Sequence, residues 1–191
     1  MIGMAQHSVM SRIDLFQLAS LQHGYFRTAQ ALAVGWTRNS LNTAVNAGEI
    51  EKISYGLYRF SHYPITPQDE LYELQTLAPE GTFTRETALT LFAMTDILPR
   101  TIHFAVPPAS GFKPRPGVTV HHARIAAAER VLRDGLWVTS PARTLVDSAK
   151  AGVDPEQLLE AAREARDSGL LGTSDLADLR RHYPYNLIEA A

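Results

Sequence analysis

The sequence predicts an α+β protein in two parts: a winged helix-turn-helix over residues 11–62, then an α+β domain with a small sheet over residues 69–191. Near the N-terminus, apolar residues recur at helical spacing, and a short alternating stretch with a glycine turn follows them. The next stretch, SHYPITPQ, has two prolines and no periodicity, which is typical of a linker. A chain of 191 residues accommodates two small domains.

The first two helices are predicted from apolar spacing and from residues that begin or end helices. Apolar residues over 13–21 form a stripe at helical spacing, and Gly24 follows as a C-terminal stop. We expect Thr28 to cap a second, short helix over residues 29–34, which Gly35 ends.

A third helix is predicted over residues 38–47, with Thr37 as its N-cap and Gly48 at its C-terminal end. Two short helices joined by a tight turn that contains glycine are the pattern of a helix-turn-helix. Three apolar residues of the third helix share one face and are expected in the core: Leu41, Ala44 and Val45.

The opposite face of this helix is polar, rich in amides and free of acidic residues. Successive residues turn by about 100° around a helix. The side chains that we expect to contact DNA from this face and its N-terminal cap are Thr37, Arg38, Asn39, Asn42, Thr43 and Asn46. Asn forms a bidentate pair with adenine in the major groove, and Arg pairs with guanine or binds phosphate. This pattern predicts a recognition helix.

A small hairpin follows the third helix. Ile50 and Ile53 alternate with polar neighbours, the chain turns at Tyr55-Gly56, and an extended stretch resumes over residues 57–60. A hairpin in this position is the wing of a winged helix. Its expected DNA contacts are Lys52, Tyr55 and Arg59. The alternative is a module of the same shape that serves only packing or protein contacts.

The charge of the chain is divided in a way that favours an N-terminal nucleic-acid interface. Residues 1–63 hold five Lys or Arg against three Asp or Glu, a net +2, whereas the remaining residues hold thirteen against seventeen, a net −4. The formal net charge of −2 argues against a protein whose whole surface is basic.

The composition, with 45% hydrophobic and 20% charged residues, is that of a folded globular protein. The absence of cysteine excludes disulfides, thiolate zinc ligands and a cysteine nucleophile, and it suits a reducing cytosol. Because the sequence shows neither a signal pattern nor a long apolar run, we expect a cytoplasmic protein with no membrane association. The common nucleotide-binding and hydrolase motifs do not occur, and we expect no cofactor and no metal site.

The stretch GYFRTAQALAVGWTRNSLNTAVNAGEIEKISYGLYRF resembles the N-terminal winged helix of AbiEi-type antitoxins, the antitoxin half of type IV toxin–antitoxin systems. The resemblance lies in aromatic residues before a short helix, a capped T/S-R-x-x-L helix and the pattern G-x-[IL]-x-[RK]-[IV]-x-x-G-x-Y. The chain departs from the family at Ser54 and Tyr55, where a basic or small residue is more usual.

In the second part, helices are expected to surround a small sheet. The expected helices are one over residues 69–77, one capped by Thr84, two that begin at Pro141 and Pro155, and a last one that carries Leu176 and Leu179. The expected strands cover residues 101–106, 118–121 and 136–139.

Two charged features of the second part are candidate partner-binding sites. The first is the loop PPASGFKPRPG, which holds Lys113 and Arg115 and no acid. The second is the pair Arg143 and Asp147, which lies at i and i+4 on a helix; it is either a shared charged site or an ion pair worth about 0.3–0.5 kcal/mol. The AbiEi-type family carries a similar S-P-x-R-T-L-x-D stretch here.

The sequence does not favour an enzyme. A restriction-type nuclease needs an acid two positions before a lysine to hold Mg²⁺, and none of Lys52, Lys113 and Lys150 has one. His103 and His121 do not favour a metal or acid–base site, because His121 and His122 point to opposite faces of a strand. A nucleic-acid-processing, nuclease-like enzyme targeted by a winged helix remains the alternative.

The expected function is that of a DNA-binding antitoxin that represses its own operon. The DNA-binding half follows from the residues. The family resemblance implies the rest: an operator with inverted repeats, and a cognate nucleotidyltransferase-type toxin that the C-terminal domain neutralises, with or without direct contact.

Overall fold

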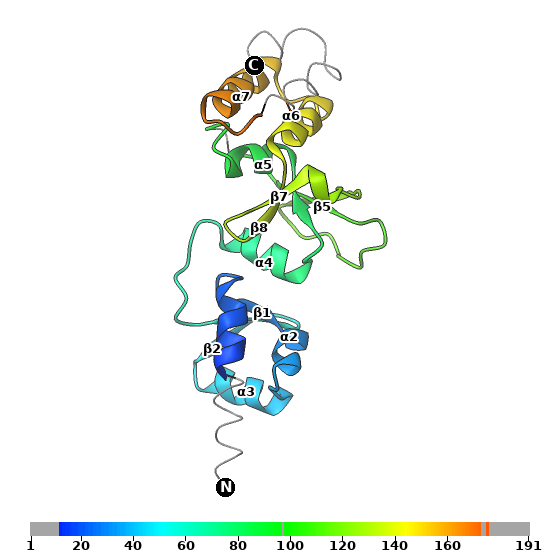
Figure 1. The fold of residues 1–191 in the computed structure, drawn as a ribbon. Coiled ribbons are helices and arrows are strands. Elements are labelled where there is room, and N and C mark those ends of the chain that lie inside the picture. The colour runs from blue at the N-terminus through cyan, green and yellow to red at the C-terminus, as the bar shows by residue number, and fades with distance from the viewer. Residues whose placement is uncertain (1–11, 97, 173–174, 176–191) are drawn as a thin grey trace. The chain divides into compact units, whose positions relative to one another are not determined.

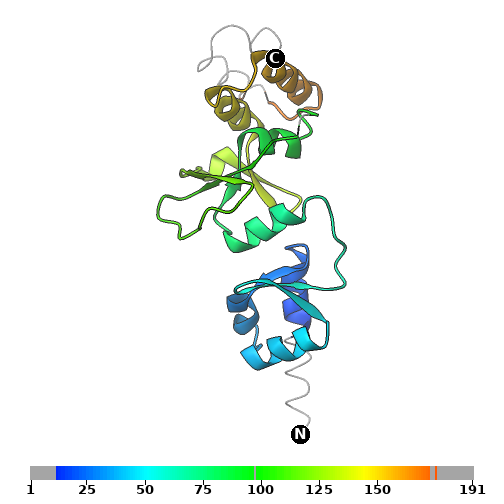
Figure 2. The same ribbon diagram turned by 180° about the vertical axis from the view of Figure 1, so that it is seen from behind.

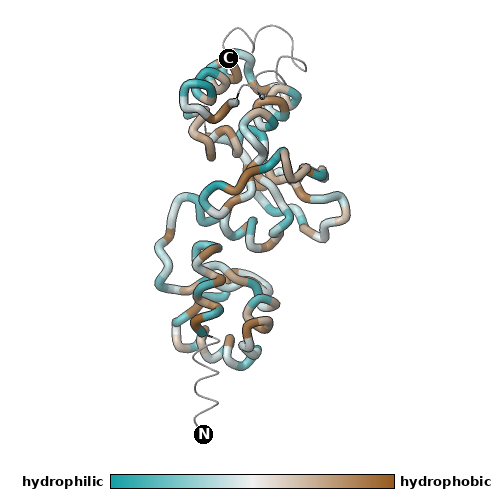
Figure 3. The backbone as a smooth tube through the Cα atoms, viewed as in Figure 1, coloured by the Kyte–Doolittle hydropathy of each residue, from teal (hydrophilic) through white to brown (hydrophobic). Residues whose placement is uncertain are grey.

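The computed structural model of the protein describes residues 12–96, 98–172 and 175, and the chain divides into two compact units (Figures 1 and 2). Unit 1 spans Met1–Pro79, and unit 2 spans Glu80–Ala191. Among the described residues, every helix falls short of the length and apolar character needed to cross a bilayer, and teal and brown segments alternate along the chain in Figure 3.

Unit 1 is a winged helix with one helix added after it. Residues 12–20 are helical. The elements that follow are β1 (Tyr25–Arg27), α2 (Thr28–Ala33), α3 (Arg38–Asn46), β2 (Ile50–Ser54), β3 (Leu57–Phe60) and α4 (Asp69–Leu77). The three strands form an antiparallel sheet in the order β1-β3-β2. The predicted helix-turn-helix and hairpin are therefore confirmed, and β1 is a strand that the sequence did not reveal.

The core of unit 1 lies between its helices and the sheet. The buried residues that form it are Leu15, Ala19, Phe26, Ala31, Trp36, Leu41, Ala44, Ile50, Tyr58 and Phe60. As expected, Leu41 and Ala44 are the inward residues of α3, while Val45 is partly buried beside them.

The N-caps of the two helix-turn-helix helices differ. Thr37 caps α3 as predicted, because its hydroxyl accepts the amide of Ser40 at 3.0 Å. Thr28, in contrast, is the first helical residue of α2 and not its cap. The N-cap is Arg27, whose amide donates to the side-chain oxygen of Gln30 at 2.8 Å. The Thr28 amide instead reaches Gly56 in the wing.

Helix α4 packs in unit 1, although the sequence pattern grouped it with the second domain. The hydroxyl of Tyr25 in β1 donates to the Asp69 carboxylate at 3.1 Å. The rings of His23 and Tyr72 stack with their centroids 3.5 Å apart. These contacts hold the first two turns of α4 against the β1 side of the winged helix.

Unit 2 is an α+β domain with a five-stranded sheet. Its elements are β4 (Thr82–Phe83), α5 (Arg85–Leu91), β5 (Ile102–Val106), β6 (Val118–His122), a 3-10 turn over Ala127–Glu129, β7 (Arg130–Arg133), β8 (Leu136–Thr139), α6 (Pro141–Lys150) and α7 (Pro155–Asp167). The strand order is β6-β5-β4-β8-β7, with β5–β6 and β4–β8 parallel and the other pairs antiparallel.

The three predicted strands and the helices that begin at Pro141 and Pro155 are confirmed, whereas β4 and β7 were not predicted. The predicted last helix with Leu176 and Leu179 lies outside the described residues. Phe83, Phe104, Leu136 and Val138 are fully buried in the sheet.

Candidate nucleic-acid interface

The outward face of α3 matches the requirements of a recognition helix. All five residues predicted to contact DNA from this helix are exposed: Arg38, Asn39, Asn42, Thr43 and Asn46. The cap fixes the N-terminal turn, since the Thr37 amide also donates to the Ser40 hydroxyl at 2.8 Å. Thr37 is exposed too, but its hydroxyl is used in capping. Guanidinium and amide groups are thus exposed on a helix whose N-terminal end is capped.

Little negative charge competes with this face. Residues 37–48 contain no acid. The first acid after α3, Glu49, is paired with Arg12 at 3.3 Å, and Glu51 follows in β2. The only formally charged side chain of α3 is therefore the exposed Arg38.

The wing presents its tip to solvent from a fixed position. Tyr55 is 98% exposed at the turn, and Lys52 is exposed on β2. Gly56 has a φ of 75°, a left-handed conformation that glycine adopts without steric cost. Its carbonyl accepts the Thr28 amide at 2.9 Å, which joins the tip to the start of α2. This hydrogen bond connects the wing to the helix-turn-helix.

Arg59, predicted as a wing contact, is not available to DNA. Its side chain is 3% exposed. One guanidinium nitrogen donates to the carbonyls of Tyr63 at 2.7 Å and Pro64 at 2.8 Å and lies 3.4 Å from the Asp69 carboxylate. The guanidinium also lies 5.5 Å from the centre of the Tyr25 ring. Arg59 is therefore a structural residue that links β3, the segment after it and α4.

The electrostatics of this buried cluster favour an ionised Asp69. Burial opposes ionisation, but hydrogen bonds from Thr66 and Tyr25 and the charge of Arg59 outweigh it and hold the pKa of Asp69 below its ordinary value. Burial and the neighbouring Asp69 carboxylate raise the pKa of Tyr25, which keeps its proton for the bond to Asp69.

In unit 2, the structure shows the predicted Arg143–Asp147 pair as part of a larger network. The Arg143 Nε lies 2.9 Å from both oxygens of Asp147, and its Nη1 lies 2.6 Å from Glu129. The Thr84 hydroxyl donates to Asp147 at 3.3 Å. Burial opposes the ionisation of Glu129, but the hydrogen bond from Arg143 outweighs it and holds the pKa of Glu129 below its ordinary value. The network ties α6 to the end of β4 and to the turn before β7.

The two candidate residues of the loop PPASGFKPRPG, Lys113 and Arg115, differ in exposure. Lys113 is exposed, whereas Arg115 is partly buried. The Arg115 carbonyl accepts the amide of Val118 at the start of β6. Lys113 is therefore the more accessible of the two to a partner.

The structure brings His103 and His121 together, which the sequence reasoning missed. Their ring nitrogens Nδ1 and Nε2 lie 3.0 Å apart, and the Nε2 of His103 lies 3.2 Å from Glu86. The parallel register pairs His121 with Ala105, two residues from His103 on the same face of the sheet. Burial, Arg85 and His103 lower the pKa of His121 to about 4. Among the described residues, no group of His, Asp and Glu is arranged to hold a metal.

The comparisons with known proteins concern unit 1 most directly. Residues 14–61 match the family described as "Transcriptional regulator, AbiEi antitoxin". The match runs from the first helix through the wing, so this region is similar to the AbiEi antitoxin family of transcriptional regulators, as the sequence pattern indicated.

A search of curated proteins finds no match. The chain is similar to a solved structure titled "Crystal structure of RV2827C protein from Mycobacterium tuberculosis". That similarity has 16% identity over 90% of this chain and 80% of the other, with a TM-score of 0.45.

Proposed function

We propose that this protein is a DNA-binding antitoxin that binds operator DNA by inserting α3 into the major groove and represses the operon that encodes it. The observation that supports this most strongly is the exposed, acid-free face of α3, next to a wing held by the Thr28–Gly56 hydrogen bond. The family match covers the same residues.

The base contacts in this proposal come from Asn39 and Asn42. Both side chains are exposed on α3, and an asparagine amide both donates to and accepts from the adenine edge. Thr43 and Asn46 extend the same polar face along the helix. In this proposal Arg38, in the first turn, binds the phosphate that flanks the groove.

The wing contacts in the proposal come from Lys52 and Tyr55. Lys52 adds a positive charge on β2, and Tyr55 presents a ring and a hydroxyl at the tip. A phosphate or the edge of the adjacent groove is the matching chemistry. We infer an operator of inverted repeats, whose two-fold symmetry would be matched by two copies of the chain.

For unit 2 we propose that it counters a nucleotidyltransferase-type toxin, the partner that the resemblance to AbiEi-type antitoxins implies, and we assign it no catalytic step. The candidate contact residues are Lys113, Arg115, Arg143 and Asp147. Lys113 is the most accessible of them, since Arg143 and Asp147 are already joined to each other.

Mobility shifts with the full-length protein test the DNA-binding proposal. Asn39→Ala and Asn42→Ala should each reduce discrimination between the promoter and a scrambled duplex by about 1–3 kcal/mol, as expected for the loss of a bidentate base contact. Gln157→Ala, which removes an exposed amide on α7, is the matched control and should leave discrimination unchanged. Unchanged discrimination in both α3 variants would contradict the placement of α3.

Coexpression tests the antitoxin proposal. The full-length chain should relieve growth arrest caused by the neighbouring toxin, and Lys113→Glu should weaken the relief if this loop contacts the toxin. The double variant Asn39→Ala/Asn42→Ala should retain it. Loss of relief in the α3 double variant, at equal protein level, would show that protection acts only through repression.

A further inference from the structure

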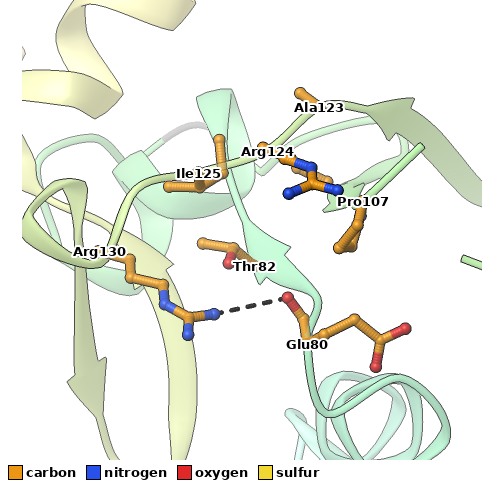
Figure 4. A pocket seen from close by; sticks show the side chains of 8 residues that line it. Glu80, Thr82, Pro107, Ala123, Arg124, Ile125 and Arg130 are labelled. Carbon is orange, nitrogen blue, oxygen red and sulfur yellow. Dashed lines mark hydrogen bonds between the residues drawn. The ribbon is translucent and has the colours of Figure 1, made fainter. Parts of the chain in front are cut away.

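Unit 2 contains a pocket on one face of its sheet, with a volume of about 350 Å³ (Figure 4). The residues that line it are Glu80, Thr82, Ala105, Pro107, Ala123, Arg124, Ile125 and Arg130. They come from β4 and the segment before it, β5 and the residue after it, the segment after β6 and the start of β7. None of them belongs to the DNA-binding surface proposed above.

The floor of the pocket consists of small side chains. Thr82 and Ala105 are direct register partners of β4 and β5, so both point to the same face of the sheet. The amide of Ala123 donates to Val106, which holds the segment after β6 beside this face. Small residues at these three positions leave the space empty, and Thr82 contributes a hydroxyl to it.

Two arginines, Arg124 and Arg130, line the pocket. Arg124 is exposed, and Arg130 lies over Trp137 with its guanidinium carbon 4.4 Å from the ring centre. The Arg130 Nη1 donates to the Glu80 carbonyl at 3.5 Å, a long and weak bond. Within the described part of the chain, neither arginine is paired with a carboxylate. The ring of Trp137 instead orients Arg130 without neutralising it.

The single carboxylate in the lining does not offset both charges. Glu80 accepts a hydrogen bond from the Ser110 hydroxyl at 2.9 Å. Figure 4 shows its carboxylate turned away from Arg130 and only its carbonyl directed toward it. The lining therefore carries two cations and one anion, and the anion is already used in a hydrogen bond.

We propose that this pocket binds the phosphate group of a nucleotide-sized phosphate monoester, with Arg124 and Arg130 as its charged ligands and Thr82 as a neutral donor. A phosphate dianion matches two guanidinium groups that reach one space from separate segments, because each can bind two of its oxygens. The volume lies near the lower end of small-molecule sites, which run from about 300 to 1,000 Å³. This leaves room for a nucleoside beside the phosphate.

Calorimetric titration of the full-length protein with the four nucleoside monophosphates tests this assignment, with the parent nucleosides and inorganic phosphate titrated in parallel. At least one monophosphate should bind more tightly than inorganic phosphate, and the nucleosides should not bind. Arg124→Gln and Arg130→Gln should each weaken binding about tenfold or more, in line with a lost charge-assisted bond. Arg163→Gln, on exposed α7, should not change it.

Arg124 is exposed, so Arg124→Gln is not expected to disturb folding and remains informative if Arg130→Gln lowers stability. Both variants should retain operator binding, which separates this site from the proposed DNA interface. The assignment is overturned if the folded protein binds no monophosphate at millimolar concentration. It is also overturned if inorganic phosphate binds as tightly as every nucleotide, or if Arg124→Gln leaves binding unchanged.

Discussion

Arg59 and Asp69 form an ion pair inside unit 1, with the nearest nitrogen and oxygen 3.4 Å apart and the arginine side chain 3% exposed. The pair joins the last strand of the wing to the first residue of α4, and the intervening carbonyls of Tyr63 and Pro64 accept the same guanidinium nitrogen. Because Arg59 is buried and paired, it contributes to the stability of unit 1 and is not part of its exposed surface.

Replacing this arginine should therefore destabilise the protein without removing a DNA contact. Arg59→Met leaves the Asp69 carboxylate partly buried without its cation, and we expect a loss of about 3 kcal/mol in the free energy of unfolding of unit 1. Lys52→Met, on the exposed side of the neighbouring strand, should change stability little and weaken DNA binding. Urea unfolding and mobility shifts measure the two effects. The reverse pattern would show that Arg59 contacts DNA.

The histidine pair should make the stability of unit 2 depend on pH. Burial and Arg85 hold the pKa of His103 low despite Glu86, and His121 has a pKa of about 4. Between about pH 4 and the ordinary histidine pKa near 6.5, the unfolded chain binds protons that the folded chain does not. Stability should therefore fall as pH decreases through this window, by up to about 1.4 kcal/mol per pH unit for each proton.

The variant His121→Gln removes one of these protons and should make the pH dependence shallower. Denaturant unfolding at about pH 7, 6 and 5 measures it. His62→Gln replaces an exposed histidine of unit 1 and is the control. An equally steep decline in His121→Gln would mean that His121 is protonated in the folded state over this range.

The proposed phosphate contact of Arg38 predicts a change in salt dependence. Arg38→Ala should weaken binding to promoter and scrambled DNA alike, because phosphates are common to both. It should reduce the slope of log affinity against log salt by about one unit. Fluorescence anisotropy over a salt series provides the measurement. A selective loss of promoter binding would instead assign Arg38 to a base.

Gly81 should not tolerate a side chain, although its φ angle lies outside the left-handed region. A Cβ at this position would lie 2.0 Å from the Cζ of Phe104, a fully buried ring of the sheet. Gly81→Ala should destabilise unit 2 by about 1–3 kcal/mol through overpacking. Gly111→Ala is the matched control, since a Cβ there has no neighbour within 4 Å. Thermal unfolding compares the two, and equal stability would show that Phe104 moves aside freely.

Local signals predicted the parts of the fold that depend on neighbouring residues in the chain. Thr37 caps α3 through Ser40, three residues away, and Tyr55-Gly56 turns the hairpin, so both are visible in short stretches. Strand β1 has three residues and exists because Tyr25 pairs with Arg59 far along the chain. Strand β4 has only two residues between two long-range partners.

The candidate sites also differ in whether local sequence or long-range contacts determine them. The exposed face of α3 follows from helical periodicity, but the burial of Arg59 depends on carbonyls and a carboxylate supplied by residues beyond the wing. The approach of His103 and His121 depends on the register of β5 and β6, which no local pattern specifies. The pocket between Arg124 and Arg130 likewise arises from strands that are adjacent only in the folded sheet.

The position of α4 also decides where the chain can be cut. A recombinant fragment that stops after the wing, near residue 62, would lack Asp69, Tyr63 and Pro64, and the buried Arg59 would be left without acceptors. It would also lack α4, whose residues Asp69 and Tyr72 contact Tyr25 and His23, and would leave these two side chains without those partners. An N-terminal piece that keeps these contacts therefore includes α4, and unit 1 as a whole extends to Pro79. Failure of a shorter fragment to bind DNA would reflect damaged folding and would carry no information about α3.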